Sequence, residues 1–140
     1  MRIRILCVGR SKERWLLDAL EFYTQRARPY VQLLWEECSD EGPLLKAAAD
    51  TSAFGLDPQG TLYESRAWSQ WMLQSLEEHG GHLTLCIGGA DGFSERLRAL
   101  LAKRLISLSP LTMTHQIVRV VLAEQIYRAV LIAHGHPYHR

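Results

Sequence analysis

Short apolar runs alternate along the chain with longer segments whose apolar residues recur every three or four positions. The runs predict strands over residues 3–8, 31–36, 52–57, 83–87 and 105–108. The longer segments predict helices over residues 12–28, 44–50, 66–79, 95–104 and 116–133, and Pro58-Gln59-Gly60 predicts a turn after the third strand. Such alternation with short connections is typical of an α/β fold with a mostly parallel sheet.

Three hydroxyl side chains stand where helices are expected to begin. Ser65 and Ser94 each precede an apolar-periodic segment and are predicted to cap it, and Thr114 is placed to cap the last helix. A chain of 140 residues fits one domain, here taken as residues 1–140. Apolar residues make up 47% and charged residues 22%, which excludes intrinsic disorder.

The lengths of the apolar runs and the spacing of the cysteines indicate the cellular compartment of the protein. No run approaches the roughly 20 residues of a membrane span, and the apolar stretch at residues 5–8 is too short for a signal-peptide core. Cys7, Cys38 and Cys86 are odd in number and show no C-x-x-C spacing, which is typical of a reducing compartment. We therefore expect a cytoplasmic protein with no membrane contact.

The last predicted helix is apolar on almost every side. A helix that faces solvent shows one apolar stripe, so this one must be covered on more than one side. Burial against a second copy predicts a homodimer, and the alternative is a core helix within one chain. Glu124 and Arg128 are four residues apart and can pair, whereas Arg119 lies away from them and is expected to serve an interface hydrogen bond or a phosphate contact.

The net charge of +1 conceals a strong asymmetry along the chain. Residues 1–28 carry +4, residues 29–95 carry −9 and residues 96–140 carry +6. The distribution permits nucleic-acid binding if the two basic ends meet on one face. The alternative is that these charges are solvated faces of separate helices.

Two irregular segments are candidates for ligand binding. Ile87-Gly88-Gly89-Ala90-Asp91-Gly92-Phe93-Ser94 places three glycines between a strand and a capped helix, where a ligand can approach the backbone closely. It fits neither the dinucleotide nor the P-loop pattern, and a plain connection is the alternative. Residues 107–115, with the sequence SLSPLTMTH, offer backbone groups to a flat polar ligand, or else only shape a turn and cap a helix.

The C-terminal segment is rich in aromatic and basic residues. His134, His136 and His139 give an H-x-H-x-x-H pattern, but no carboxylate or cysteine nearby completes a metal site, so no metal is expected. Tyr138 and the histidines can stack on bases, and Arg140 can pair with a phosphate. The segment therefore favours nucleic-acid binding over a metal site or a frayed end.

Taken together, three segments resemble one family. IGGADGFS, LSLSPLTMTHQIVRVVLAEQIYRA and HPYHR are similar to the RlmH family of large-subunit rRNA pseudouridine methyltransferases, within the SPOUT class of knotted methyltransferases. VGRSKERWLLDALEFYTQR and LDPQGTLYESRAW are looser but collinear matches. The resemblance covers essentially the whole chain and is most specific over residues 87–140.

The resemblance implies a fold, a cofactor and a substrate. The fold would be an α/β trefoil knot formed by the C-terminal third, with helices on both faces of the sheet. S-adenosylmethionine would contact Leu56, Gly89, Ser109, Pro110, Leu111, Thr112, Met113 and Thr114. The substrate would be a pseudouridine of large-subunit rRNA, methylated at N3 on the assembled ribosome by a homodimer.

The implied reaction needs a route for one proton. The N3–H of pseudouridine is a weak acid and must be lost before or during methyl transfer, so a base would help. His139 and His115 are the candidates, with His139 ranked first, while Arg128, Tyr138 and Arg140 are expected to position the RNA. Two other functions remain open, a ribosome-binding module without turnover and a flavodoxin-like enzyme that holds phosphate in the glycine loop.

Overall fold

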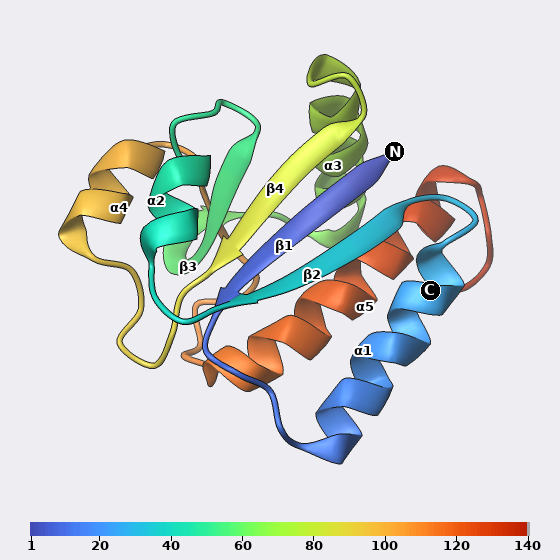
Figure 1. Ribbon diagram of the computed structural model, residues 1–140. Helices are drawn as coiled ribbons and strands as arrows, with labels where there is room; N and C mark the ends of the chain where they lie inside the picture. Colours follow the sequence, from blue (N-terminus) through green and yellow to red (C-terminus); the bar gives the residue numbers. More distant parts are fainter. Residues whose placement is uncertain (140) are drawn as a thin grey trace.

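The computed structural model describes residues 1–139 and contains one parallel sheet. Its strands are β1 (Arg2–Val8), β2 (Gln32–Cys38), β3 (Ala53–Leu62), β4 (His82–Ile87) and β5 (Leu105–Ser107). They lie in the order β2-β1-β4-β3-β5, and every pairing between them is parallel (Figure 1). The predicted α/β class is therefore confirmed, and these strands are all parallel rather than mostly so.

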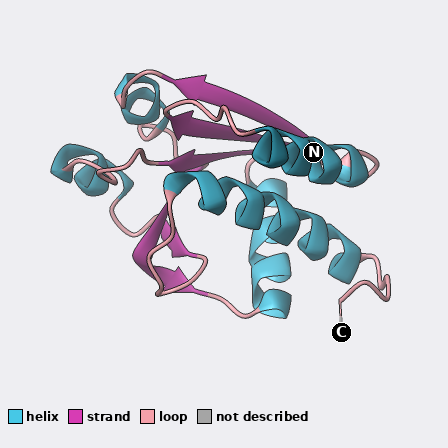
Figure 2. Cartoon of the chain, turned by 90° about the horizontal axis from the view of Figure 1, so that it is seen from below, coloured by secondary structure: helices cyan, strands magenta, loops and turns pink. Residues whose placement is uncertain are grey.

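Helices cover both faces of the sheet (Figures 1 and 2). They are α1 (Arg14–Ala27), α2 (Gly42–Ala47), α3 (Ser65–Glu78), α4 (Glu95–Leu101) and α5 (His115–Ala133). Ile5 packs in the larger core with α1, α3 and α5, whereas the next residue, Leu6, packs in a second core with Leu44 of α2 and Leu97 of α4. Successive strand residues point to opposite faces, so the continuous apolar run of β1 serves both cores.

Strand β3 does not end where the sequence predicted. It runs on through Pro58 to Leu62, with a shift of register against β5. Asp57 Oδ1 accepts a hydrogen bond of 2.9 Å from the N–H of Gln59, so the predicted turn is a local irregularity inside the strand. A Cβ on Gly60 would lie 2.5 Å from the backbone nitrogen of Ile106, which explains why a glycine stands at this crossing.

Two of the three predicted helix caps are confirmed. Ser94 Oγ accepts from the N–H of Leu97 at 3.1 Å, and Thr114 Oγ1 accepts from the N–H of Ile117 at 3.2 Å. Ser65 was wrongly placed, because it is already the first helical residue and Glu64 holds the cap position without a side-chain bond.

The last helix lies between α1 and α3, and a single chain covers most of it. Leu122, Ile126 and Val130 are buried in the larger core, and Ile117 is the one large apolar residue of α5 that is exposed. The core-helix alternative thus accounts for much of its apolar character, and the homodimer stays a prediction. Among residues 1–139, no helix is long and apolar enough to cross a bilayer.

Candidate functional site

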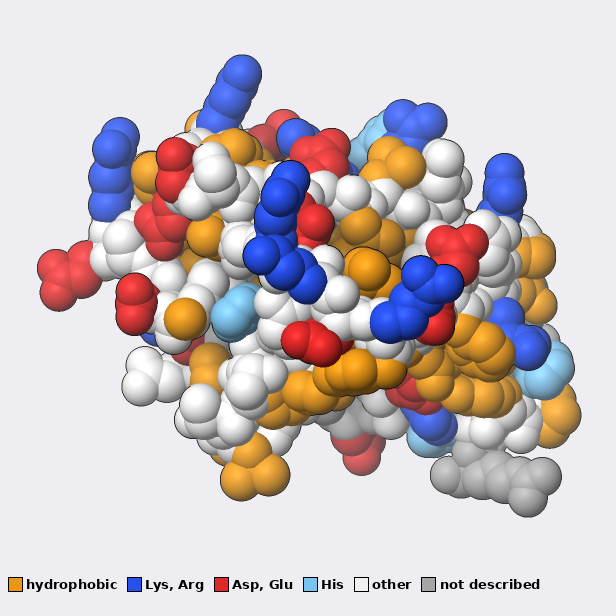
Figure 3. Space-filling view, turned by 60° about the horizontal axis from the view of Figure 1, so that its bottom comes forward, with side chains coloured by type: hydrophobic (Ala, Val, Ile, Leu, Met, Phe, Trp, Pro, Cys, Tyr) orange, Lys and Arg blue, Asp and Glu red, His pale blue; other side chains and the backbone are white. Residues whose placement is uncertain are grey.

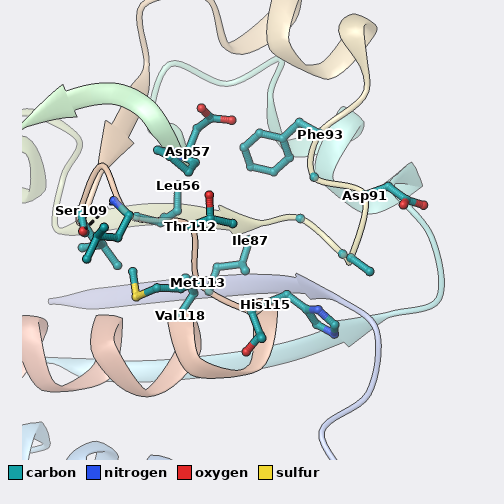
Figure 4. Close-up of a pocket in the computed structure, with 18 of the residues that line it drawn as sticks. Leu56, Asp57, Ile87, Asp91, Phe93, Ser109, Thr112, Met113, His115 and Val118 are labelled. Carbon is teal, nitrogen blue, oxygen red and sulfur yellow. Dashed lines mark hydrogen bonds between the residues drawn. The ribbon is translucent and has the colours of Figure 1, made fainter.

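A cavity of about 680 Å³ opens at the carboxyl ends of β4 and β5, beside the irregular middle part of β3 (Figure 4). Its walls come from three segments, residues 56–58, 87–93 and 108–115, with Arg98 and Val118 added from α4 and α5. Ligands of open parallel sheets bind at this edge, and small-molecule sites have volumes of about 300–1,000 Å³. The two irregular segments that the sequence marked as ligand loops therefore face one cavity.

The conformation of the glycine loop requires glycine at two of its positions. The N–H of Gly92 donates to the carbonyl of Gly89 at 3.0 Å, and Gly92 has a φ of 71°, which favours glycine. A Cβ on Gly88 would lie 2.9 Å from the carbonyl carbon of Gly92, so this position also excludes a side chain. Phe93, only 8% exposed, anchors the loop in the second core.

The hydroxyl-rich loop is held by its own serines. Ser107 Oγ donates to the carbonyl of Ser109, and Ser109 Oγ accepts from the N–H of Leu111, each at 3.0 Å. Leu111 lines the cavity although its residue surface is 74% exposed. Its apolar side chain is therefore available for contact with a ligand in the cavity.

The structure brings together most of the predicted cofactor residues. Seven of the eight line the cavity: Leu56, Gly89, Ser109, Leu111, Thr112, Met113 and Thr114. Pro110 is not among the lining residues, whereas the candidate base His115 is.

An ion pair in the cavity wall was missed by the sequence analysis. Asp57 is 6% exposed, and its Oδ2 pairs with Nη2 of Arg98. Both residues line the cavity. Asp57 follows Leu56 directly, so its place beside a predicted contact was the signal available.

Arg119 was wrongly expected at an interface or on a phosphate, because it is buried inside the chain. It is 1% exposed, and Nη1 donates to Ser11 Oγ and, at 2.9 Å, to Glu37 Oε2. Nη2 donates to the carbonyls of Val8 at 3.3 Å and Gly9 at 3.0 Å. A guanidinium with this many acceptors holds the segment after β1 against α5.

Arg128 and Tyr138, two residues expected to position the RNA, lie together with Glu124 of α5 and the candidate base His139. We call these four residues the tail cluster. Glu124 Oε1 accepts from Arg128 Nη2 at 2.6 Å and from the Tyr138 hydroxyl at 3.0 Å. Arg128 Nη1 lies 3.0 Å from His139 Nδ1. Burial and the bond to Glu124 raise the pKa of Tyr138 to about 12, so its phenol stays protonated. Arg140 lies outside the described residues.

The tail cluster and the cavity lie at opposite ends of one helix. His115 and Arg128 are both in α5, and a rise of 1.5 Å per residue separates them by about 20 Å. The two candidate bases are therefore not brought together within one chain, since His139 is bonded to Arg128.

Comparison with known proteins adds the family. The family described as "Predicted SPOUT methyltransferase" matches residues 1–139. The chain belongs to the SPOUT methyltransferase family.

Curated SPOUT relatives share the whole length of the chain. "Ribosomal RNA large subunit methyltransferase H" of Protochlamydia amoebophila is 41% identical over 143 residues, covering 100% of this chain and 99% of the relative. The proteins of that name from Pelobacter propionicus and Methylocella silvestris are 36% and 37% identical over 153 and 161 residues, covering 99% and 100% of this chain and 99% of each relative. The resemblance to the RlmH family is thereby confirmed.

The surface of this SPOUT chain carries apolar side chains beside its charges. Figure 3 shows hydrophobic side chains gathered in a band on one face. The exposed large apolar residues include Trp15, Leu17 and Phe22 of α1, with Leu111 and Ile117 near the start of α5.

Within residues 1–139, no three His, Cys, Asp or Glu side chains gather as they would around a metal ion.

Proposed function

We propose that this SPOUT enzyme transfers a methyl group from S-adenosylmethionine to N3 of a pseudouridine in large-subunit rRNA on the assembled ribosome. The observation that carries the proposal is the cavity at the carboxyl edge of the sheet, lined by seven of the eight expected cofactor residues. The full-length relatives named as large-subunit rRNA methyltransferases support the substrate class. A ribosomal substrate also supports a cytoplasmic location.

The cavity has the chemistry that S-adenosylmethionine needs. Leu56, Leu111 and Val118 offer apolar walls, and the two loops offer backbone polar groups. When bound, the cofactor supplies a methyl group on a positively charged sulfur. The protein holds the methyl donor and the acceptor in line, and such alignment can lower the activation barrier by roughly 7–11 kcal/mol.

The proton on N3 needs an acceptor, and we keep His139 as the first candidate. Arginine only donates hydrogen bonds, so Nδ1 of His139 accepts from Arg128 and its ring proton lies on Nε2. Neutral His139 has no other free lone pair in its ring, so it becomes a base only when Arg128 releases Nδ1. A phosphate of the bound RNA, which binds arginine strongly, would cause that release.

The separation of about 20 Å between cavity and tail cluster along α5 favours a homodimer. A partner chain would place its tail cluster at the cavity of the first chain, which one chain cannot do for itself. The exposed apolar residues of α1 and of the start of α5 are the surface we assign to that contact. Light scattering should then give about twice the chain mass of 16.0 kDa, and a mass of one chain would contradict the dimer.

We also propose that the C-terminal third forms the trefoil knot typical of SPOUT proteins. The sheet order supports it, because β3 lies between β4 and β5 and the chain then returns as α5 to the opposite end of the molecule. A knotted chain requires threading, which slows refolding. Refolding from a denatured state should therefore be slower when a folded domain is fused to the C-terminus, whereas an equal rate would contradict the knot.

The decisive experiment is transfer of labelled methyl from S-adenosylmethionine to ribosomes from cells that lack this protein. Isolated subunits and naked rRNA serve as parallel acceptors. Label in large-subunit rRNA of assembled ribosomes alone is the expected result. No label from a protein that binds S-adenosylmethionine would overturn the substrate, and absence of cofactor binding would favour a ribosome-binding module instead.

A further inference from the structure

A chain of hydrogen bonds connects the buried Arg119 to the cavity residue His115. Arg119 Nη1 donates to Ser11 Oγ, which lies 2.8 Å from Gln116 Oε1. Gln116 Nε2 lies 2.9 Å from the carbonyl oxygen of Arg10 and 3.1 Å from Nε2 of His115. The function assigned to the cavity makes no use of Gln116.

The direction of every bond in this chain is fixed by its two ends. A guanidinium has no acceptor atom, so Ser11 Oγ accepts a hydrogen bond from Arg119. The hydroxyl then donates its single proton to Gln116 Oε1. At the other end, the carbonyl of Arg10 can only accept, so the amide nitrogen of Gln116 must face it. Both ends therefore require the same orientation of the Gln116 amide.

That orientation decides which nitrogen of His115 carries the proton. The NH₂ group of Gln116 points a hydrogen at Nε2 of His115, and Nε2 must accept it. The neutral ring is then protonated on Nδ1, and Nδ1 is the nitrogen left for a ligand in the cavity that His115 lines.

We propose that Gln116 is a positioning residue that holds His115 as the Nδ1–H tautomer, so that His115 donates a hydrogen bond to an oxygen of the bound ligand. The acceptor is a carboxylate or carbonyl oxygen, a chemistry shared by the cofactor and by the pyrimidine base. His115 is thereby a donor and not the base of the reaction. The identity of the ligand rests on the proposed function, whereas the tautomer does not.

The tautomer is measured directly by NMR of protein labelled with ¹⁵N-histidine, without any ligand. Nε2 of His115 should show the chemical shift of an unprotonated nitrogen, opposite to the tautomer that free histidine favours. Gln116→Met should shift this signal toward the free-histidine value, as should Ser11→Ala, which removes the proton that orients the amide. Gln74→Met, the same change at an exposed position of α3, should leave it unchanged.

Each NMR outcome bears on the proposal. A protonated Nε2 in the wild-type protein would overturn it. An unprotonated Nε2 that persists in both folded variants would overturn the role of Gln116. Cooperative unfolding of each variant establishes that the compared proteins are folded.

The donor role is tested by two replacements of His115 that keep different parts of the ring. An asparagine amide reaches the place of Nδ1, and a glutamine amide reaches the place of Nε2. His115→Asn should keep ligand binding within about threefold, whereas His115→Gln should weaken it about tenfold, as expected for one lost hydrogen bond. Equal losses in the two variants would overturn the donor role.

Two readouts tell the possible sources of the acceptor oxygen apart. Calorimetry with S-adenosylmethionine alone reports a bond to the cofactor, and the KM for ribosomes reports a bond to the base. If wild-type protein transfers no methyl group to any acceptor, the proposed function fails. The NMR test of the tautomer needs no ligand, so its result is independent of that failure.

Discussion

Nη1 of the buried Arg119 donates to Oε2 of Glu37 at 2.9 Å, and this ion pair fastens the first turns of α5 to the end of β2. The side chain of Arg119 is 1% exposed and that of Glu37 is 41% exposed. Removing one partner of a fully buried pair costs about 3–5 kcal/mol, because the other charge is left buried. Since Glu37 is partly solvated, we expect Glu37→Ala to lower the free energy of unfolding by about 2 kcal/mol, measured by urea denaturation.

The neighbouring residue provides the control for this prediction. Glu36 pairs with Arg4 at 2.9 Å, but both side chains are nearly half exposed, at 45% and 43%. Surface pairs contribute about 0–1 kcal/mol, so Glu36→Ala should change stability by less than 1 kcal/mol. Equal losses in the two variants would contradict the structural role of Arg119.

The three cysteines should differ in reactivity. Burial raises the pKa of Cys7 and of Cys86 to about 12, while Cys38 is only half-buried and its pKa is raised less. At pH 8 a thiol with a pKa near 12 is about 10⁻⁴ ionised, and the thiolate is the reactive form. A disulfide reagent should therefore modify Cys38 alone in the native protein and all three cysteines in urea.

The same pKa values set the alkaline stability of the fold. The unfolded chain loses its thiol protons near the ordinary pKa of 9.0, whereas the folded chain keeps those of Cys7 and Cys86 up to about 12. The folded state then binds more protons, so the free energy of unfolding should fall as pH rises from 9 towards 12. A double variant, Cys7→Ala with Cys86→Ala, should show a smaller fall, and an equal fall would contradict this assignment.

The order of elements was predictable from the sequence because each apolar run and each periodic segment carries a local signal. The end of β3 was not, because Pro58-Gln59-Gly60 is typical of a turn and only the pairing with Ile106 of β5 keeps it in the sheet. The role of Arg119 could not be predicted either, since its partners Glu37 and Ser11 lie 82 and 108 residues away along the chain.

The candidate site was predictable in parts. Glycine and hydroxyl residues mark loops that can bind a ligand, and parallel strands bring such loops to one edge. The position of Asp57 next to Leu56 was a signal that it lies near the cavity, but its partner Arg98 could not be foreseen, because nothing in the sequence joins β3 to α4. The sequence marked Arg128, Tyr138 and His139 separately, but not that the segment after α5 turns back so that Tyr138 and His139 contact Glu124 and Arg128.

Leu111 is expected to contribute to cofactor binding without supporting the fold. Its residue surface is 74% exposed at the cavity, and fully burying a leucine is worth about 1.5–3 kcal/mol. Leu111→Ser should therefore weaken S-adenosylmethionine binding about tenfold in calorimetry and leave the unfolding free energy nearly unchanged. Leu100→Ser, an exposed leucine of α4 outside the cavity, should bind as the wild type does, and a similar loss there would argue against a specific contact.

His139 should affect turnover and not cofactor affinity. It is bonded to Arg128, about 20 Å along α5 from His115, so within one chain it does not touch the cavity. If it takes the N3 proton in the partner's site, His139→Gln should lower kcat by about 10²–10⁴-fold, while the Kd for S-adenosylmethionine stays that of the wild type. His79→Gln is the control, since that ring is bonded to the carbonyl of Ser75, outside the tail and the cavity, and the variant should turn over normally.

Mixed dimers then decide whether the tail acts across the interface. A His139→Gln chain and a Leu111→Ser chain each carry one defective part, and a dimer of the two keeps one intact tail facing one intact cavity if the tail serves the partner. When the two denatured variants are mixed and refolded together, activity measured with S-adenosylmethionine well below its Kd should therefore rise above that of either parent. If the tail served its own chain, the mixed dimer would have no fully intact site, and activity would not exceed the mean of the parents. An unchanged kcat in His139→Gln would remove His139 as the base and leave Arg128 and Tyr138 as the parts of the tail cluster that position the RNA.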